Sequence, residues 1–202
     1  MLTSLIGVLI YWGNCMRVGL DLDGTVVNTP IAMIEYINER LPLNLTINDI
    51  KTYRIEDALP EQYRWIVENG FRDSIFWKKV ELIEGAYENI KKLYEENKEL
   101  YFVTSSLPLN LKKKIGHLTR NLDFFPKDYV WRRTINIHEK QRLDLDILVD
   151  DALYNLIGDR LYYSICVDMP YNQTNEIIPN FTRAKDWDEI YDKVHMIEES
   201  TK

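Results

Sequence analysis

Residues 17–25 read RVGLDLDGT, a short apolar run that ends in two aspartates and a glycine turn. The apolar part predicts a buried strand, and an Asp-Gly pair favours a turn directly after it. In an open α/β sheet, ligands bind beyond the carboxyl ends of the strands. Asp21 and Asp23 therefore stand where a ligand site is expected. Taken alone, the stretch is explained equally well by a strand followed by an ordinary turn.

Two later apolar runs also end in polar side chains. One precedes Thr104 and Ser105, and the other precedes Asp150 and Asp151. Taken singly, the hydroxyls could cap the next helix, and the paired acids could favour a helix N-terminus. If the three strands are neighbours, four carboxylates meet at one edge of the sheet, and they stay ionised only beside a cation. Mg²⁺, which prefers oxygen ligands, meets that need.

The periodicity of the chain divides it into three parts. Residues 30–84 combine helical spacing with many aromatic side chains, which predicts a small, mainly helical insertion. Residues 16–29 and 85–202 alternate strand and helix patterns, which predicts an α/β core with a parallel sheet and helices on both faces. Residues 1–15 are expected to be an upstream extension that contributes little, because Met16 starts the first strand naturally.

Individual elements follow from the same patterns. In the core, helices are predicted at residues 86–97, 108–122, 154–161 and 187–197, and strands at 100–103, 129–137, 146–149 and 163–167. In the insertion, helices are predicted at residues 31–41 and 61–69, the second of which ends at Gly70. Thr46 and Asp49 resemble the ends of a capping box with Asp in place of Glu.

The composition of the 202 residues is that of an ordinary globular protein, with 46% hydrophobic and 28% charged residues. The net charge of −7 argues against a surface that binds a nucleic acid polymer. Two cysteines and three scattered histidines argue against a disulfide framework and a zinc cluster. The apolar run at residues 5–12 is too short to span a membrane. A cytoplasmic protein with a small-molecule partner is therefore expected.

The polar positions form an ordered set along the chain, namely Asp21, Asp23, Thr104, Lys140, Asp150 and Asp151. This set resembles the four motifs of the haloacid dehalogenase (HAD) superfamily of phosphatases. The resemblance covers residues 17–191. It implies a Rossmann-like core with a small helical cap inserted after the first strand, and it implies hydrolysis of a phosphate monoester with Mg²⁺.

The same resemblance implies a role for each residue. Asp21 would attack phosphorus and form an aspartyl-phosphate, while Asp23 would protonate the leaving alcohol and then activate water. Thr104 would bind the phosphoryl oxygens and Lys140 would neutralise their charge. The consecutive lysines at residues 112–114 compete for that role but are expected to form an exposed helical face. The implied metal ligands are Asp21, the backbone carbonyl of Asp23, Asp151 and, at or near the metal, Asp150.

Further features narrow the resemblance. The helical insertion lies between the first two motifs, residues 102–106 read FVTSS, and residues 168–172 read DMPYN ahead of Arg183 and Trp187. In this layout the chain is similar to the 5′(3′)-deoxyribonucleotidases, also called cytosolic type C 5′-nucleotidases. That similarity implies dephosphorylation of (deoxy)nucleoside monophosphates.

The narrower resemblance also implies that rings of the insertion stack on the base, each contributing about 1–3 kcal/mol. Phe71 is the best candidate and Tyr53 the second, although a place in the core of the insertion explains either ring equally well. Ser105 is a further expected substrate contact. Thr29 and Ala152 depart from the pattern, since relatives often carry an aromatic and a basic residue there. Base and sugar preference therefore stay open.

Other functions are compatible with the sequence. The same chemistry could act on a sugar phosphate or a phosphoamino acid, or could transfer phosphate to an acceptor other than water. A non-catalytic binding protein would usually have lost a motif carboxylate or lysine. An interaction module would use the ring-rich insertion to hold a partner. A homodimer is also compatible with the sequence.

Overall fold

The structure, a computed structural model, describes residues 15–201, so residues 1–14 of the expected extension lie outside the described residues. The core is a six-stranded parallel sheet with the order β3-β2-β1-β4-β5-β6. The strands are β1 (Arg17–Asp21), β2 (Glu99–Thr104), β3 (Thr134–Asn136), β4 (Ile147–Asp150), β5 (Tyr163–Val167) and β6 (Phe181–Ala184). The predicted α/β class is confirmed.

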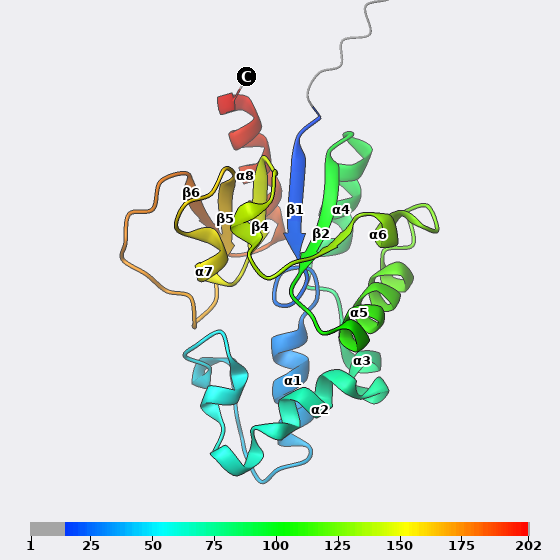
Figure 1. Ribbon diagram of the computed structural model, residues 1–202, viewed down its shortest axis with the longest axis vertical. Helices are drawn as coiled ribbons and strands as arrows, with labels where there is room; N and C mark the ends of the chain where they lie inside the picture. Colours follow the sequence, from blue (N-terminus) through cyan, green and yellow to red (C-terminus); the bar gives the residue numbers. More distant parts are fainter. Residues whose placement is uncertain (1–14, 202) are drawn as a thin grey trace, which may run out of the picture.

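Strand β1 lies in the middle of the sheet, between β2 and β4 (Figure 1). It is almost completely buried, as expected for a parallel strand that is covered on both faces. The register pairs Asp21 with Val103 of β2 and Leu20 with Val149 of β4. Asp21 is therefore level with Asp150, and the polar ends of three strands reach the same edge of the sheet.

Helices cover the sheet. They are α4 (Ala86–Glu95), α5 (Pro108–Asn121), α6 (Tyr129–Arg132), the 3₁₀ turn η4 (Lys140–Arg142), α7 (Leu153–Leu156) and α8 (Trp187–Thr201). Helices α4 and α8 pack on each other, and α7 packs on β4 and β5. The buried side chains Ile90 and Leu93 of α4, and Ile190 and Val194 of α8, have helical spacing. Within residues 15–201, every helix falls short of the length and apolarity that a membrane crossing requires.

The helical insertion (residues 30–84) lies at the carboxyl edge of the sheet, below β1 in Figure 1. It contains α1 (Thr29–Asn38), α2 (Trp65–Arg72), α3 (Ser74–Lys79) and the 3₁₀ turns η1 (Ile47–Asp49), η2 (Ile55–Ala58) and η3 (Glu61–Tyr63). Helix α1 packs on α2 and α3, and α2 also contacts α5 of the core. The capping box predicted for Thr46 and Asp49 is confirmed.

Several predicted elements of the core were wrong. Residues 129–137, expected as one strand, form α6 and then β3, because a helical turn buries Val130 before the strand begins. The helix expected at residues 154–161 ends at Leu156, before Gly158 with its positive φ. Strand β6 was not predicted, since of its four residues only Ala184 is buried and no apolar run marks it.

Gly70 does not end its helix, contrary to the prediction. Helix α2 continues through Gly70 to Arg72. A Cβ at Gly70 would lie 2.9 Å from Sδ of Met33, so the glycine allows α2 to lie close to α1. The following turn is formed by Asp73, whose side chain accepts a hydrogen bond from the backbone of Ile75 and caps α3.

Trp187 joins the C-terminal helix to the turn after β1. It is buried and donates from Nε1 to the carbonyl oxygen of Thr25 at 2.9 Å. Trp187→Phe keeps a ring but leaves that carbonyl without its donor, so the free energy of unfolding in urea should fall by about 1–3 kcal/mol. Trp131→Phe, at an exposed ring, is the control and should change it by less than about 0.5 kcal/mol. Equal stability of the two variants would contradict this anchoring role.

Candidate active site

Three buried carboxylates meet at the carboxyl edge of the sheet. Asp21 ends β1, and Asp150 and Asp151 stand at the end of β4. Each offers an oxygen within 4.8 Å of oxygens from the other two. Burial raises the pKa of Asp21 to about 7 even though Lys140 opposes it. Burial, followed by the charges of Asp21 and Asp150, raises the pKa of Asp151 well above its usual range.

Lys140 supplies positive charge to this cluster. Its Nζ donates to Oδ1 of Asp21 and, at 2.7 Å, to Oδ2 of Asp150. Burial alone would lower the pKa of Lys140, but the charges of Asp150 and Asp21 outweigh it and raise that pKa. Asp150 also accepts from Nδ2 of Asn155 at 3.0 Å and from the backbone of Ala152 at 2.8 Å. Both oxygens of Asp150 are therefore occupied by hydrogen bonds.

Lys114, on α5, is a second buried cation at the site. Its side chain is only 5% exposed and forms an ion pair with Asp23. Its Nζ also donates to Oγ1 of Thr104 at 3.2 Å and to Oγ of Ser106 at 2.6 Å. Lys114 thus connects the second aspartate of the first motif to the hydroxyls that follow β2.

The prediction that residues 112–114 form one exposed face was wrong for Lys114. Lys112 is exposed as expected, but Lys114 is buried. Three consecutive lysines cannot share one face of a helix, because successive residues turn by about 100°. The sequence did carry one indication that Lys114 is buried. The apolar residue Leu118 follows four positions later, residues at this spacing lie on the same face of a helix, and Leu118 is buried.

Three carboxylate oxygens are buried without a hydrogen-bond partner among the described residues. They are Oδ2 of Asp21, Oδ1 of Asp23 and Oδ1 of Asp151. The carboxylates of the site also outnumber its two buried ammonium groups. Buried anionic oxygens without partners are destabilising, and a hard divalent cation with oxygen ligands would satisfy them. The residues present therefore fit such a metal ion.

A cavity of ≈270 Å³ opens beside the carboxylates. Its lining includes the three predicted substrate contacts, Ser105, Phe71 and Tyr53. The site residues Asp23, Lys114 and Asp151 also line it. The hydroxyl of Ser105 additionally lies 2.5 Å from Nδ1 of His138, a contact that the sequence did not indicate. The cavity thus joins the charged cluster of the core to side chains of the insertion.

Phe71 lies both in the core of the insertion and in the cavity wall, the two positions that the sequence left open for it. Its ring contacts Phe76 and Trp77 at centroid distances of 5.5 and 6.3 Å, so it belongs to the aromatic core of the insertion. It also lines the cavity. Phe76 and Trp77 are buried, in agreement with the core role preferred for them. Tyr53 packs edge-on against Tyr154 of α7, at 5.4 Å, and so bridges the insertion and the core.

The fold and this set of side chains define a hydrolase of the HAD superfamily. The chain is similar in structure to a HAD family hydrolase from Deinococcus radiodurans, solved with bound phosphate and sodium. The TM-score is 0.59 and the identity 15%, over 91% of this chain and 96% of that chain. At this identity the likeness supports the fold alone.

The chain belongs to the family described as 5′ nucleotidase, deoxy (pyrimidine), cytosolic type C protein, whose model matches residues 14–199. It is 26% identical to a protein named "Putative nucleotidase" from Halalkalibacterium halodurans, over 85% of this chain and 91% of that protein. It is 24% identical to a "Putative 5′(3′)-deoxyribonucleotidase" from Staphylococcus epidermidis, over 67% of this chain and 73% of that protein. The chain is therefore a phosphomonoesterase of the nucleotidase type, and the superfamily predicted from the sequence is confirmed.

Gly24 gives a sharp test of how tightly the site is packed. Its φ is +76°, and an added Cβ would clash with Oδ2 of Asp151. Gly24→Ala should therefore displace that carboxylate and remove most of the phosphatase activity. The left-handed backbone should also cost the variant about 1–2 kcal/mol of stability. Gly158→Ala is the matched control, because its φ is +83° and none of the described atoms lies within 4 Å of the added Cβ.

Gly24→Ala should lose at least as much stability as Gly158→Ala in denaturant unfolding, and only Gly24→Ala should lose phosphate release. Full activity of Gly24→Ala, or an equal loss in both, would show that close packing on Asp151 is unimportant.

Proposed function

We propose that the chain hydrolyses (deoxy)nucleoside monophosphates with Mg²⁺, through an aspartyl-phosphate on Asp21. One observation carries the proposal. The Asp21 carboxylate is held by Lys140 through Oδ1, while its Oδ2 is buried without a hydrogen-bond partner among the described residues. The carboxylate is thus oriented but not saturated by hydrogen bonds, beside a cavity of ≈270 Å³ that can receive the substrate.

In the first step a bond forms between an Asp21 oxygen and phosphorus, and the bond from phosphorus to the leaving oxygen breaks. Asp23 gives its proton to that oxygen. In the second step Asp23 takes a proton from water, whose oxygen bonds to phosphorus as the Asp21–phosphorus bond breaks. Thr104 donates its hydroxyl hydrogen bond to the phosphoryl group. The position of Asp23 in the cavity wall supports this assignment.

The proposed Mg²⁺ ligands are the carboxylates of Asp21 and Asp151 and the backbone carbonyl of Asp23. Asp150 is close enough to be a ligand, but both of its oxygens already accept hydrogen bonds. We assign it instead to orienting Lys140. Bound Mg²⁺ would draw electron density from the phosphoryl oxygens.

The nucleoside would occupy the cavity next to the insertion. Phe71 offers a ring for the base, and the lining also includes apolar Val67 and Ile55 and polar Ser105 and Arg54. A flat, partly polar group suits such a wall. The family description and the name of the S. epidermidis relative support a nucleotide as substrate, and the word cytosolic in that description supports a cytoplasmic location.

A substrate panel tests the proposal. Deoxy- and ribonucleoside 5′- and 3′-monophosphates would be compared with sugar phosphates and phosphoserine, with Mg²⁺ and with chelator. Nucleotides should give the highest kcat/KM, and chelator should abolish turnover. Equal or better turnover of sugar phosphates or phosphoserine would assign the site to that substrate class instead.

Asp21→Asn should remove turnover, because an amide cannot form the covalent intermediate. Phosphate release should fall below detection while the thermal unfolding transition persists. Asp159→Asn, at an exposed carboxylate outside the site, should keep the wild-type rate. Retained turnover in Asp21→Asn would refute the nucleophile assignment.

Lys114→Met should lower kcat/KM by about 10²–10³-fold, the usual effect of removing one donor to a transition-state oxyanion. The expectation rests on the position of Nζ, 3.2 Å from Oγ1 of Thr104, where an entering phosphate would compete with Asp23 for the lysine. Methionine keeps most of the length of the side chain and removes its charge and its hydrogen-bond donors. Lys112→Met, on the same helix but exposed, is the control and should keep the wild-type kcat/KM. A similar small effect in both variants would exclude the role of Lys114.

A further inference from the structure

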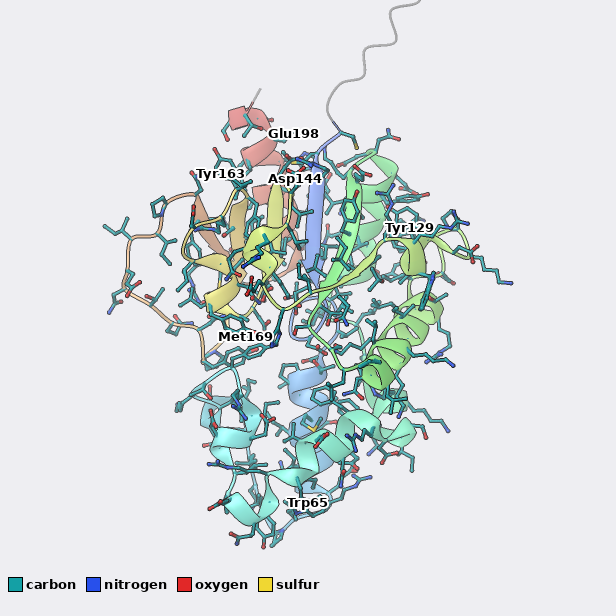
Figure 2. The ribbon with its side chains drawn as sticks, viewed as in Figure 1. Trp65, Tyr129, Asp144, Tyr163, Met169 and Glu198 are labelled. Carbon is teal, nitrogen blue, oxygen red and sulfur yellow. The ribbon has the colours of Figure 1, made fainter. Side chains whose placement is uncertain are left out.

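The loop of residues 168–172 touches the site but has no part in the steps above. It follows β5, and Figure 2 shows Met169, its second residue, at the edge of the sheet that faces the insertion. Residues 168–172 read DMPYN, which is part of the resemblance to the nucleotidases, and the sequence assigns these residues no chemical role. Its contacts with Asp151 suggest what it does.

Tyr171 fixes one oxygen of the Asp151 carboxylate. Its hydroxyl donates to Oδ2 of Asp151, which leaves Oδ1 as the oxygen without a partner among the described residues. With Oδ2 engaged by Tyr171, Oδ1 is the oxygen of Asp151 that is free to meet a cation.

Asn172 fixes the backbone of the same residue. Its Nδ2 donates to the carbonyl oxygens of Asp151 and Val167, each at 2.7 Å. Its Oδ1 accepts from the backbone of Met169 at 3.1 Å and from Arg183. Asn172 is buried, so these hydrogen bonds are shielded from water. Adjacent residues of one loop thus hold both the side chain and the main chain of Asp151.

Arg183, on β6, hydrogen-bonds to both ends of the loop. It donates to Oδ1 of Asp168 at 2.9 Å from Nε and at 2.6 Å from Nη2. Its Nη1 donates to the carbonyl oxygen of Asn172 at 3.2 Å. The guanidinium therefore joins the first and last residues of the loop. Gly24 packs against the oxygen that Tyr171 holds, since an added Cβ there would clash with Oδ2 of Asp151 and lie 3.2 Å from the hydroxyl of Tyr171.

We propose that Tyr171 is a positioning residue that holds the Asp151 carboxylate with Oδ1 turned towards the metal ion, on a loop that Asn172 and Arg183 keep rigid. The inference rests on the proposed function only in that Asp151 is a metal ligand. Partners of this kind, which hydrogen-bond a metal ligand, typically change metal affinity by about 10–100-fold when removed.

Tyr171 also lines the cavity, so a direct contact with substrate is the competing role. The two roles differ in what they change. A positioning residue alters the affinity for Mg²⁺ and leaves the KM for nucleotide at saturating Mg²⁺ unchanged. A substrate contact raises that KM and leaves Mg²⁺ affinity alone.

The experiment is calorimetric titration of the full chain with Mg²⁺ in the absence of substrate. Tyr171→Phe keeps the ring and removes only the hydroxyl, and its Kd for Mg²⁺ should rise about 10–100-fold. Tyr87→Phe is the matched control, because its hydroxyl also donates to a carboxylate, that of Asp123 at 2.8 Å, away from the site. Its Kd should equal that of the wild type.

Arg183→Lys serves as the second variant, since lysine cannot bridge Asp168 and Asn172 together. It should weaken Mg²⁺ binding in the same direction while leaving the hydroxyl of Tyr171 in place. Saturating Mg²⁺ should restore kcat in both variants.

The outcomes separate the two proposals. Unchanged Mg²⁺ affinity in Tyr171→Phe, with a raised KM for nucleotide, would overturn the inference and leave the proposed function standing. If Tyr171→Phe did not fold, an unchanged Kd in Arg183→Lys would overturn it. Absence of Mg²⁺ binding in the wild-type chain would overturn the metal-dependent function and the inference together.

Discussion

The close approach of buried carboxylates at the ends of β1 and β4 is the constraint on which the rest of the site depends. Burial and, after it, the neighbouring like charges disfavour ionisation there, and they raise the pKa of Asp21 against the opposing charge of Lys140. The parallel register makes the approach unavoidable, since Asp21 lies level with Asp150. The apolar strands stabilise the sheet, and Lys140 and a metal ion are what the accumulated charge then requires.

The second buried lysine, Lys114, balances negative charge beside the cavity in the same way. Lys114 reaches Asp23 from α5, and α5 is contacted by α2, the helix that carries Phe71. Lys114, which forms an ion pair with Asp23, and the ring of Phe71 are therefore carried by helices in contact. Gly70 lets α2 lie close to α1, because an added Cβ would press on the end of the Met33 side chain. Packing in the insertion thus sets the position of Phe71 relative to the charges.

The sequence predicted the central part of the fold well, because local patterns determine it. The apolar run ending at Asp21, with its counterparts before Thr104 and Asp150, showed both the parallel sheet and the edge where the polar groups gather. The edge strand β6 depends on pairing with β5, which no local pattern encodes, and the burial of Lys114 was indicated only by the apolar Leu118 four residues later. Phe71 shows the same limit. Its spacing is that of a core residue, and its place in the cavity follows only from the packing of α2 on α5.

The paired aspartates at the end of β4 show why two adjacent carboxylates can differ so much. Strand β4 ends at Asp150, so Asp151 lies in the loop that follows and meets different surroundings. Asp150 has both oxygens occupied by Lys140, Asn155 and a backbone amide. Asp151 has a donor for one oxygen only. A carboxylate that accepts hydrogen bonds at both oxygens is suited to orienting its neighbours, whereas one with an oxygen free of hydrogen bonds is suited to binding an ion. The difference comes from partners on different segments, since Lys140 precedes β4 and Asn155 follows it, whereas Tyr171 lies in the loop after β5.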